Sequence, residues 1–114
     1  MKVRLISSRW PSHGRVEIYY NGAWGRVCGS NWDLKNGRVI CRMLGYSHVL
    51  AADGGEEYGR GNGPIWLSKV QCTGNEESIV TCSHQGWGVH DCSQDNEAWV
   101  VCSNSGNSCA VEFI

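Results

Sequence analysis

The sequence places seven cysteines in a chain of 114 residues. Leu, Ile, Val and Phe together make up about a fifth of the chain, which is the lower limit of what a packed globular core uses. A small domain with so few aliphatic side chains usually depends on cross-links for its stability. We therefore expect one loop-rich domain from an oxidising compartment, with one cysteine left over if the other six are paired.

The charge balance excludes several classes of function. Ten basic and eleven acidic side chains give a net charge of -1, which provides no global field for nucleic acid or an anionic membrane. The longest apolar run, Ala98 to Cys102, is much shorter than the roughly 20 residues of a spanning helix. We expect no native nucleic-acid partner and no membrane insertion. Residues 1–4 lack the apolar stretch of a secretion signal, so we also expect the chain to be a fragment of a longer protein.

Local patterns predict a hairpin and a helix. Residues 16–20 alternate apolar and polar side chains, Asn21-Gly22 suits a tight turn, and residues 23–28 form the returning strand. Asp33 can cap a helix that runs from Leu34 to Leu44 and stops at Gly45. The other predicted elements are an irregular loop over 47–63, a strand over 65–70, a helical turn over 76–81, a strand over 98–101 and a mobile tail from 103.

The cysteines fit either a disulfide framework or a metal site. Zinc sites usually bring ligands in pairs with roughly two to four residues between them, and no two cysteines have that spacing. Cys82 with His84 and His90 with Cys92 could supply four ligands, but each pair is too close for the usual zinc knuckle. We therefore favour disulfides, although spacing alone leaves their pairing open.

Several motifs together resemble a scavenger receptor cysteine-rich (SRCR) domain, and the six-cysteine pattern resembles its group A variety. The resemblance covers about Val3 to Cys102 and divides the chain into a domain over 1–102 and a tail over 103–114. It implies an extracellular α+β fold in which a curved antiparallel sheet cradles one helix between long irregular loops. The motifs are Val3–Leu5, Gly14–Ile18, Asn21–Cys28, Trp32-Asp33, Val39–Tyr46, Gly63–Leu67, Val70–Gly74 and Gly86–Cys92.

The resemblance also implies the disulfide pairing. The implied bridges are Cys28 to Cys92, Cys41 to Cys102 and Cys72 to Cys82. The two longer loops would each contribute about 4 kcal/mol and the short one about 3 kcal/mol in the chain-entropy model. Cys109 lies beyond the last family position, so it is the unpaired cysteine and could link two copies of the chain.

The resemblance implies binding rather than catalysis. Family members recognise polyanions, microbial surfaces or extracellular proteins, so we expect a pattern-recognition or adhesion module in a secreted protein or receptor ectodomain. The alternative is an accessory interaction domain of a larger protease, oxidase or receptor, without a ligand of its own. No nucleophile motif surrounds any of the four histidines, so we expect no intrinsic catalysis.

A calcium site is doubtful, and we expect no cofactor to be required. The family commonly carries acids directly after the first cysteine and six residues before the last, where this chain has Gly29, Ser30 and Asn96. A hard cation needs several converging oxygen ligands, which these replacements remove. The weak candidates that remain are Asp33, which already serves as a helix cap, and Asp95 and Glu97.

Basic residues are the first candidates for ligand binding, because arginine recognises phosphate and sulfate through two parallel hydrogen bonds. The candidates are Arg26, Lys35, Arg38, Arg42 and Lys69. The spacing of Lys35, Arg38 and Arg42 places them near one helix face, where a merely solvated stripe is the alternative.

Tryptophans are the second candidates. Four of them stand at large apolar positions of the family and are predicted to lie in the core: Trp24, Trp32, Trp66 and Trp87. Trp10 and Trp99 depart from the family pattern, and an exposed tryptophan is a favoured binding anchor. Alternatively, Trp99 fills the space left by Gly29 and Ser30.

Overall fold

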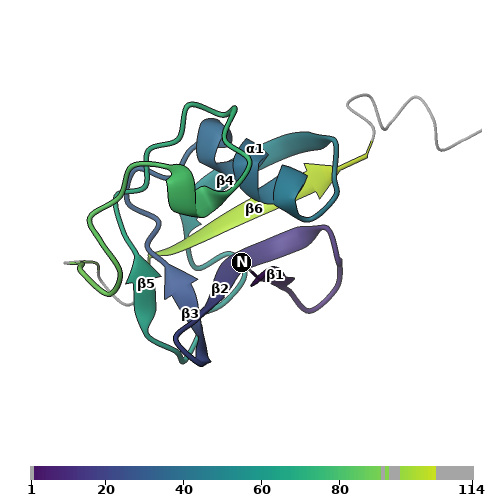
Figure 1. Ribbon diagram of the computed structural model, residues 1–114. Helices are drawn as coiled ribbons and strands as arrows, with labels where there is room; N and C mark the ends of the chain where they lie inside the picture. The colour runs from purple at the N-terminus through teal and green to yellow at the C-terminus, as the bar shows by residue number, and fades with distance from the viewer. Residues whose placement is uncertain (1, 91, 93–95, 105–114) are drawn as a thin grey trace, which may run out of the picture.

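The computed structural model describes residues 2–90, 92 and 96–104, and shows a curled sheet with one helix (Figure 1). In that part of the chain no helix is long and apolar enough to cross a membrane. The elements are β1 (Lys2–Ile6), β2 (His13–Tyr20), β3 (Ala23–Val27), α1 (Leu34–Met43), β4 (His48–Gly55), β5 (Ile65–Leu67), the short 3-10 helix η1 (Ile79–Thr81) and β6 (Glu97–Ser103).

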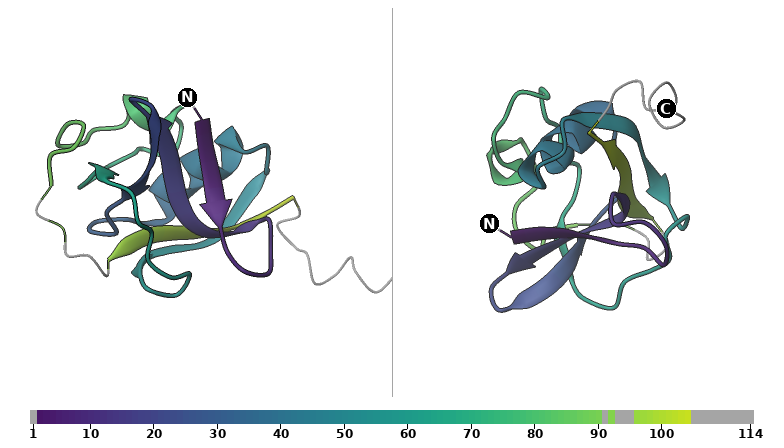
Figure 2. Two further views of the ribbon diagram at one scale, coloured as in Figure 1. Left: turned by 90° about the horizontal axis from the view of Figure 1, so that it is seen from below. Right: turned by 90° about the vertical axis from the view of Figure 1, so that its right-hand side faces the viewer.

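The six strands form one mixed sheet. Its order is β4-β6-β2-β3-β5, with β1 paired to β2. The predicted α+β fold, with a curved sheet cradling one helix, is confirmed, and Figure 2 shows the helix and the sheet from two further directions. The sheet is not purely antiparallel, because β3 and β5 run parallel. The chain passes through α1 and β4 between them, and a crossover of this kind allows a parallel pair.

The predicted hairpin and helix are both present. Asn21 and Gly22 have φ of 53° and 83°, the left-handed geometry of the tight turn between β2 and β3. The side chain of Asp33 accepts hydrogen bonds from the backbone N–H groups of Lys35 and Asn36 at 3.0 and 3.2 Å, which caps α1. A Cβ on Gly37 would lie 2.8 Å from the Cβ of Ala52, so a glycine here lets α1 approach β4 closely.

The prediction of an irregular loop over 47–63 is wrong for its first half. Strand β4 pairs with β6 from His48 opposite Ser103 to Gly55 opposite Glu97. Its glycines suggest a loop, but hydrogen bonds to a strand more than forty residues away decide the conformation. The predicted strand over 65–70 is shorter, because Lys69 has φ of 53° and cannot continue it.

The inner face of the sheet and α1 enclose the core, and three disulfides cross-link the chain. They join Cys28 to Cys92, Cys41 to Cys102 and Cys72 to Cys82, the pairs that the resemblance implied. The second of these ties α1 directly to β6. Cys109 and most of the predicted tail lie outside the described residues, so the domain division after residue 102 stays a prediction.

The tryptophans do not all join the core as predicted. Trp32 is buried, and Trp66 and Trp87 pack against the core while remaining partly exposed. Trp24 lies instead under the Arg4 guanidinium, 4.0 Å from the ring centroid. Gly25 and Val27 are the buried residues of β3, so strand alternation turns Trp24 to the outer face.

Candidate functional site

The outer face of the sheet carries a network of charged side chains. In β2, Val16 and Ile18 enter the core, and the strand alternation turns Glu17 to the other face. Its carboxylate accepts from Arg4 at 2.7 Å and from Arg15 at 3.2 Å, although only 7% of the Glu17 side chain is exposed. These two arginines therefore neutralise a buried carboxylate.

Arg26 has the same kind of role. Its Nη1 donates to Glu97 Oε2 at 3.1 Å and its Nε donates to the Gly63 carbonyl at 2.8 Å. The backbone N–H of Gly61 donates to the same Glu97 oxygen at 2.7 Å. Only 12% of the Arg26 side chain is exposed, so this predicted anion-binding residue is engaged by protein groups.

The helix presents its cations differently. Lys35, Arg38 and Arg42 are all exposed on one side of α1 and form what we call the helix cation stripe. Arg42 donates to the backbone carbonyls of Glu76 and Gly74 at 2.7 and 2.8 Å. A Cβ on Gly74 would lie 3.7 Å from Arg38 Nη1 and 3.8 Å from Lys35 Cβ, so the whole stripe borders this turn.

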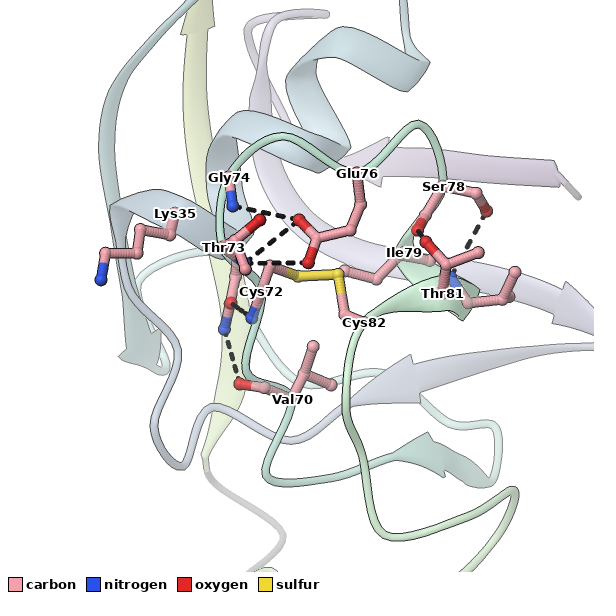
Figure 3. Close-up of a disulfide and its surroundings, with 12 residues drawn as sticks. Lys35, Val70, Cys72, Thr73, Gly74, Glu76, Ser78, Ile79, Thr81 and Cys82 are labelled. Carbon is pink, nitrogen blue, oxygen red and sulfur yellow. Dashed lines mark hydrogen bonds between the residues drawn. A yellow bond between two sulfur atoms is a disulfide. The ribbon is translucent and has the colours of Figure 1, made fainter.

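The turn over 73–76 is held by its own carboxylate. The side chain of Glu76 accepts from the backbone N–H groups of Thr73 and Gly74 at 2.9 and 3.0 Å (Figure 3). The Thr73 N–H is the main cause that holds the pKa of Glu76 below its ordinary value of 4.5. The anchor of Arg42 is therefore a fixed piece of backbone.

A possible metal cluster beside this turn is excluded by its sulfur chemistry. Ligand atoms of Cys72, Glu76 and Cys82 lie within 4.8 Å of one another. Figure 3 shows, however, that the two sulfurs are bonded to each other. A disulfide offers no thiolate, which is the form of cysteine that binds metal.

The weak calcium candidates are not brought together. Asp33 caps α1, Glu97 is bound to Arg26, and Asp95 lies outside the described residues. The Asn96 amide oxygen packs so closely against Gly29 and Gly54 that neither position could carry a Cβ without displacing it. Asn96, and not Trp99, therefore fills the space beside Gly29.

Of the two predicted binding tryptophans, Trp10 lines a groove and Trp99 lies behind one of its lining residues. Trp10 is 55% exposed, its ring centroid lies 5.8 Å from that of His13, and His13 meets the edge of Tyr58 at 6.5 Å. The Trp99 ring packs against Tyr58, with the two ring centroids 5.6 Å apart. We call this the aromatic groove; it has a volume of about 630 Å³ and is lined by Ile6, Ser7, Ser8, Arg9, Trp10, His13, Arg15, Glu57, Tyr58 and Gly59.

Sequence reasoning missed His13 and Tyr58. His13 lies in β2, the strand whose apolar and polar side chains alternate in the sequence. Extending that alternation to residue 13 would have placed His13 on the outer face with Glu17. Tyr58 carried no local signal, since its position depends on the loop after β4. The remaining candidate, Lys69, is exposed between β5 and the Cys72 turn and lines neither the aromatic groove nor the other described pockets.

The family model of the scavenger receptor cysteine-rich domain matches residues 6–103. The chain belongs to the SRCR family. It is 45% identical over 102 residues to the macrophage scavenger receptor types I and II of Mus musculus, and 47% identical over 102 residues to the galectin-3-binding protein of Rattus norvegicus. Each alignment covers 90% of this chain but only 22% and 18% of these curated relatives, so the SRCR domain spans about a fifth of their length.

Solved SRCR structures share the fold. The third SRCR domain of murine neurotrypsin matches with a TM-score of 0.81 at 38% identity, covering 91% of this chain and 96% of that one. The dimeric form of the SRCR domain of mouse MARCO matches with a TM-score of 0.74 at 46% identity, covering 80% and 86%. This SRCR domain is thus extracellular, in a secreted protein or a receptor ectodomain, and serves as a ligand-binding module.

Proposed function

We propose that this SRCR domain binds anionic polymers of microbial surfaces through the helix cation stripe. The observation that carries the proposal is that Lys35, Arg38 and Arg42 form no ion pair with another described residue, whereas Arg4, Arg15 and Arg26 on the sheet each pair with a glutamate. The three cations of the stripe are exposed and form none of these pairs. Their charge is thus available to a ligand.

The stripe suits an extended anion. Residues spaced by three and four along a helix lie side by side, so three positive charges follow one edge of α1. The adjoining turn contains one carboxylate, that of Glu76. It accepts hydrogen bonds from the backbone N–H groups of Thr73 and Gly74 and forms no ion pair with the stripe. The names of the relatives, a scavenger receptor and a binding protein, support a binding role in place of an accessory domain without a ligand.

Charge removal tests this proposal. We expect the double variant K35Q/R38Q to bind dextran sulfate and lipoteichoic acid about tenfold more weakly, and to lose part of the salt dependence of binding. The matched control K2Q/R9Q removes two exposed charges from β1 and the segment after it and should bind normally. Equal losses in both variants, or salt-independent binding by the unmodified domain, would contradict the proposal.

We also propose that binding needs no calcium. The supporting observation is that Glu97 is neutralised by Arg26 and that Asn96 fills the space next to Gly29. Binding of dextran sulfate should therefore be the same in EDTA and in added calcium. A loss of binding in EDTA that calcium restores would disprove this.

We infer that the domain acts by binding and not by catalysis. Ser47 Oγ lies 2.8 Å from Nδ1 of His48, but both residues are exposed and no described carboxylate orients the ring. Nδ1 of His84 and of His90 each accept a backbone N–H instead. Incubation of the domain with ester and peptide substrates should release no product above background.

We propose that the domain is of the group A, six-cysteine variety, and that Cys109 is the cysteine available for an intermolecular link. The six other cysteines form the three disulfides, which supports this assignment. Peptide mapping without reductant should recover the three pairs, and Cys109→Ser should abolish any disulfide-linked dimer. A dimer that persists in Cys109→Ser would show that this cysteine does not form the intermolecular link.

A further inference from the structure

The aromatic groove lies apart from the helix cation stripe and has a different chemistry. Its most prominent side chain is Trp10, which leaves more than half of its surface in water. A large aromatic side chain exposed in a concave site usually marks a contact with a ligand. Trp10 is also larger than any other strongly exposed apolar residue of the described chain, so its placement needs a reason.

Trp10 is held in place by the protein itself. Its backbone N–H donates to Ser7 Oγ at 3.1 Å, and the same hydroxyl donates to the Trp10 carbonyl at 2.8 Å. The His13 N–H reaches that carbonyl at 3.4 Å, and the His13 ring lies beside the indole. A fixed platform loses little conformational entropy when it binds, which favours affinity from a small contact.

Tyr58, which also lines the groove, is held by the protein as well. Arg15 Nη1 donates to the Tyr58 carbonyl at 2.8 Å, and Trp99 of β6 packs behind the Tyr58 ring. The loop after β4 is therefore fastened to the sheet where it forms the groove. Trp10, His13 and Tyr58 are therefore neighbouring rings, with centroids 5.8 Å and 6.5 Å apart and planes inclined to one another.

The polar groups of the groove are balanced in charge. Arg9 and Glu57 contribute opposite charges, and Arg15 is already paired with Glu17. Ser8, Arg9 and Glu57 together offer both donors and acceptors beside the exposed indole. An uncharged ligand with one apolar face and a rim of hydroxyl groups fits this combination. A pyranose ring has that form, because its axial C–H groups can stack on an aromatic face while its hydroxyls bond sideways.

We propose that the aromatic groove binds a neutral sugar residue of an extracellular glycan, with Trp10 as the stacking platform. The volume of about 630 Å³ lies within the range of small-ligand sites and admits a short oligosaccharide segment. This site goes beyond the proposed anion binding, since it uses another surface and needs no net charge. The extracellular location of the domain places glycans within its reach.

The test is binding of the full chain to an array of neutral oligosaccharides, followed by titration of the best one. Trp10→Ala should weaken that binding about tenfold, while Trp10→Phe, which keeps an aromatic face, should stay within about threefold of the unmodified domain. Leu50→Ala is the matched control, because Leu50 is 49% exposed and does not line the groove. Binding should be insensitive to salt, unlike that of dextran sulfate.

Several outcomes would overturn the proposal. They are the absence of any neutral oligosaccharide that binds, unchanged binding by Trp10→Ala, and binding of proline-rich peptides but not glycans. The helix variant K35Q/R38Q distinguishes the two proposals. It should bind the neutral glycan normally and dextran sulfate more weakly, whereas Trp10→Ala should bind dextran sulfate normally and the neutral glycan more weakly. Unchanged dextran sulfate binding by K35Q/R38Q would contradict the anion site, and unchanged glycan binding by Trp10→Ala would contradict the sugar site.

Discussion

Arginines over the sheet and cations on the helix look alike in the sequence but have different roles. Arg4, Arg15 and Arg26 each reach a glutamate that is almost fully buried. The helix cation stripe, in contrast, is exposed: Arg42 donates to two backbone carbonyls, and none of the three side chains forms an ion pair with another described residue. A positive charge is thus structural where the fold has buried its carboxylate partner, and available to a ligand where it has not.

The disulfide between α1 and β6 is the largest stabilising link between these two regions. Removing it with C41S/C102S should lower the free energy of unfolding by about 4 kcal/mol, because the bridge closes a long loop. C72S/C82S, which opens a loop of sequence separation 10, should cost about 3 kcal/mol. Denaturant unfolding measures both values. A domain whose melting temperature is unchanged by reductant would refute the dependence on cross-links.

The buried glutamate of β6 should show the next largest effect. Glu97→Gln removes the partner of Arg26 and leaves a guanidinium that is only 12% exposed without a counter-charge. We expect a loss of about 3 kcal/mol in the free energy of unfolding, the usual cost of breaking a buried pair. Glu57→Gln, at an exposed position, is the control and should change stability by less than about 0.5 kcal/mol.

Acid should loosen the turn beside the helix. The pKa of Glu76 is lowered by hydrogen bonds to the ionised carboxylate, so this group stabilises the folded turn above its ordinary pKa of 4.5. That contribution is lost as the pH falls through the lowered pKa of the folded state. An NMR titration should show the Thr73 and Gly74 amide signals moving with the Glu76 carboxyl, and no movement in Glu76→Gln.

Removing the helix cations should have the smallest effect on stability. K35Q/R38Q deletes two exposed charges that form no ion pair with a described residue, so the free energy of unfolding should change by less than about 0.5 kcal/mol. Thermal melts of this variant and of Glu97→Gln compare the two regions directly. A large loss of stability in the helix variant would show that its cations are structural after all.

Short-range features were predictable from the sequence, and long-range pairing was not. The Asp33 cap and the Asn21-Gly22 turn depend on neighbouring residues, so their patterns sufficed. The pairing of Arg26 with Glu97 joins residues 71 positions apart, and nothing near either residue indicates it. Strand β4 was missed for the same reason, because its partner β6 follows more than forty residues later.

The two candidate sites also differ in how far the sequence predicts them. The helix periodicity of the sequence alone places Lys35, Arg38 and Arg42 together. The aromatic groove combines Trp10 with Tyr58, which come together only when the loop after β4 folds across the outer face of the sheet. Sequence departures from the family pattern singled out Trp10 and Trp99, but not the residues between them.

The most direct test of the difference between sheet and helix is the salt dependence of dextran sulfate binding by two charge-matched variants. K35Q/R38Q and R4Q/R26Q each remove two positive charges, so the net charge of the domain changes equally. We expect K35Q/R38Q to lose about tenfold in affinity with a flatter salt dependence, and folded R4Q/R26Q to bind like the unmodified domain. Equal losses in the two variants would show that net charge, and not the helix cation stripe, governs binding.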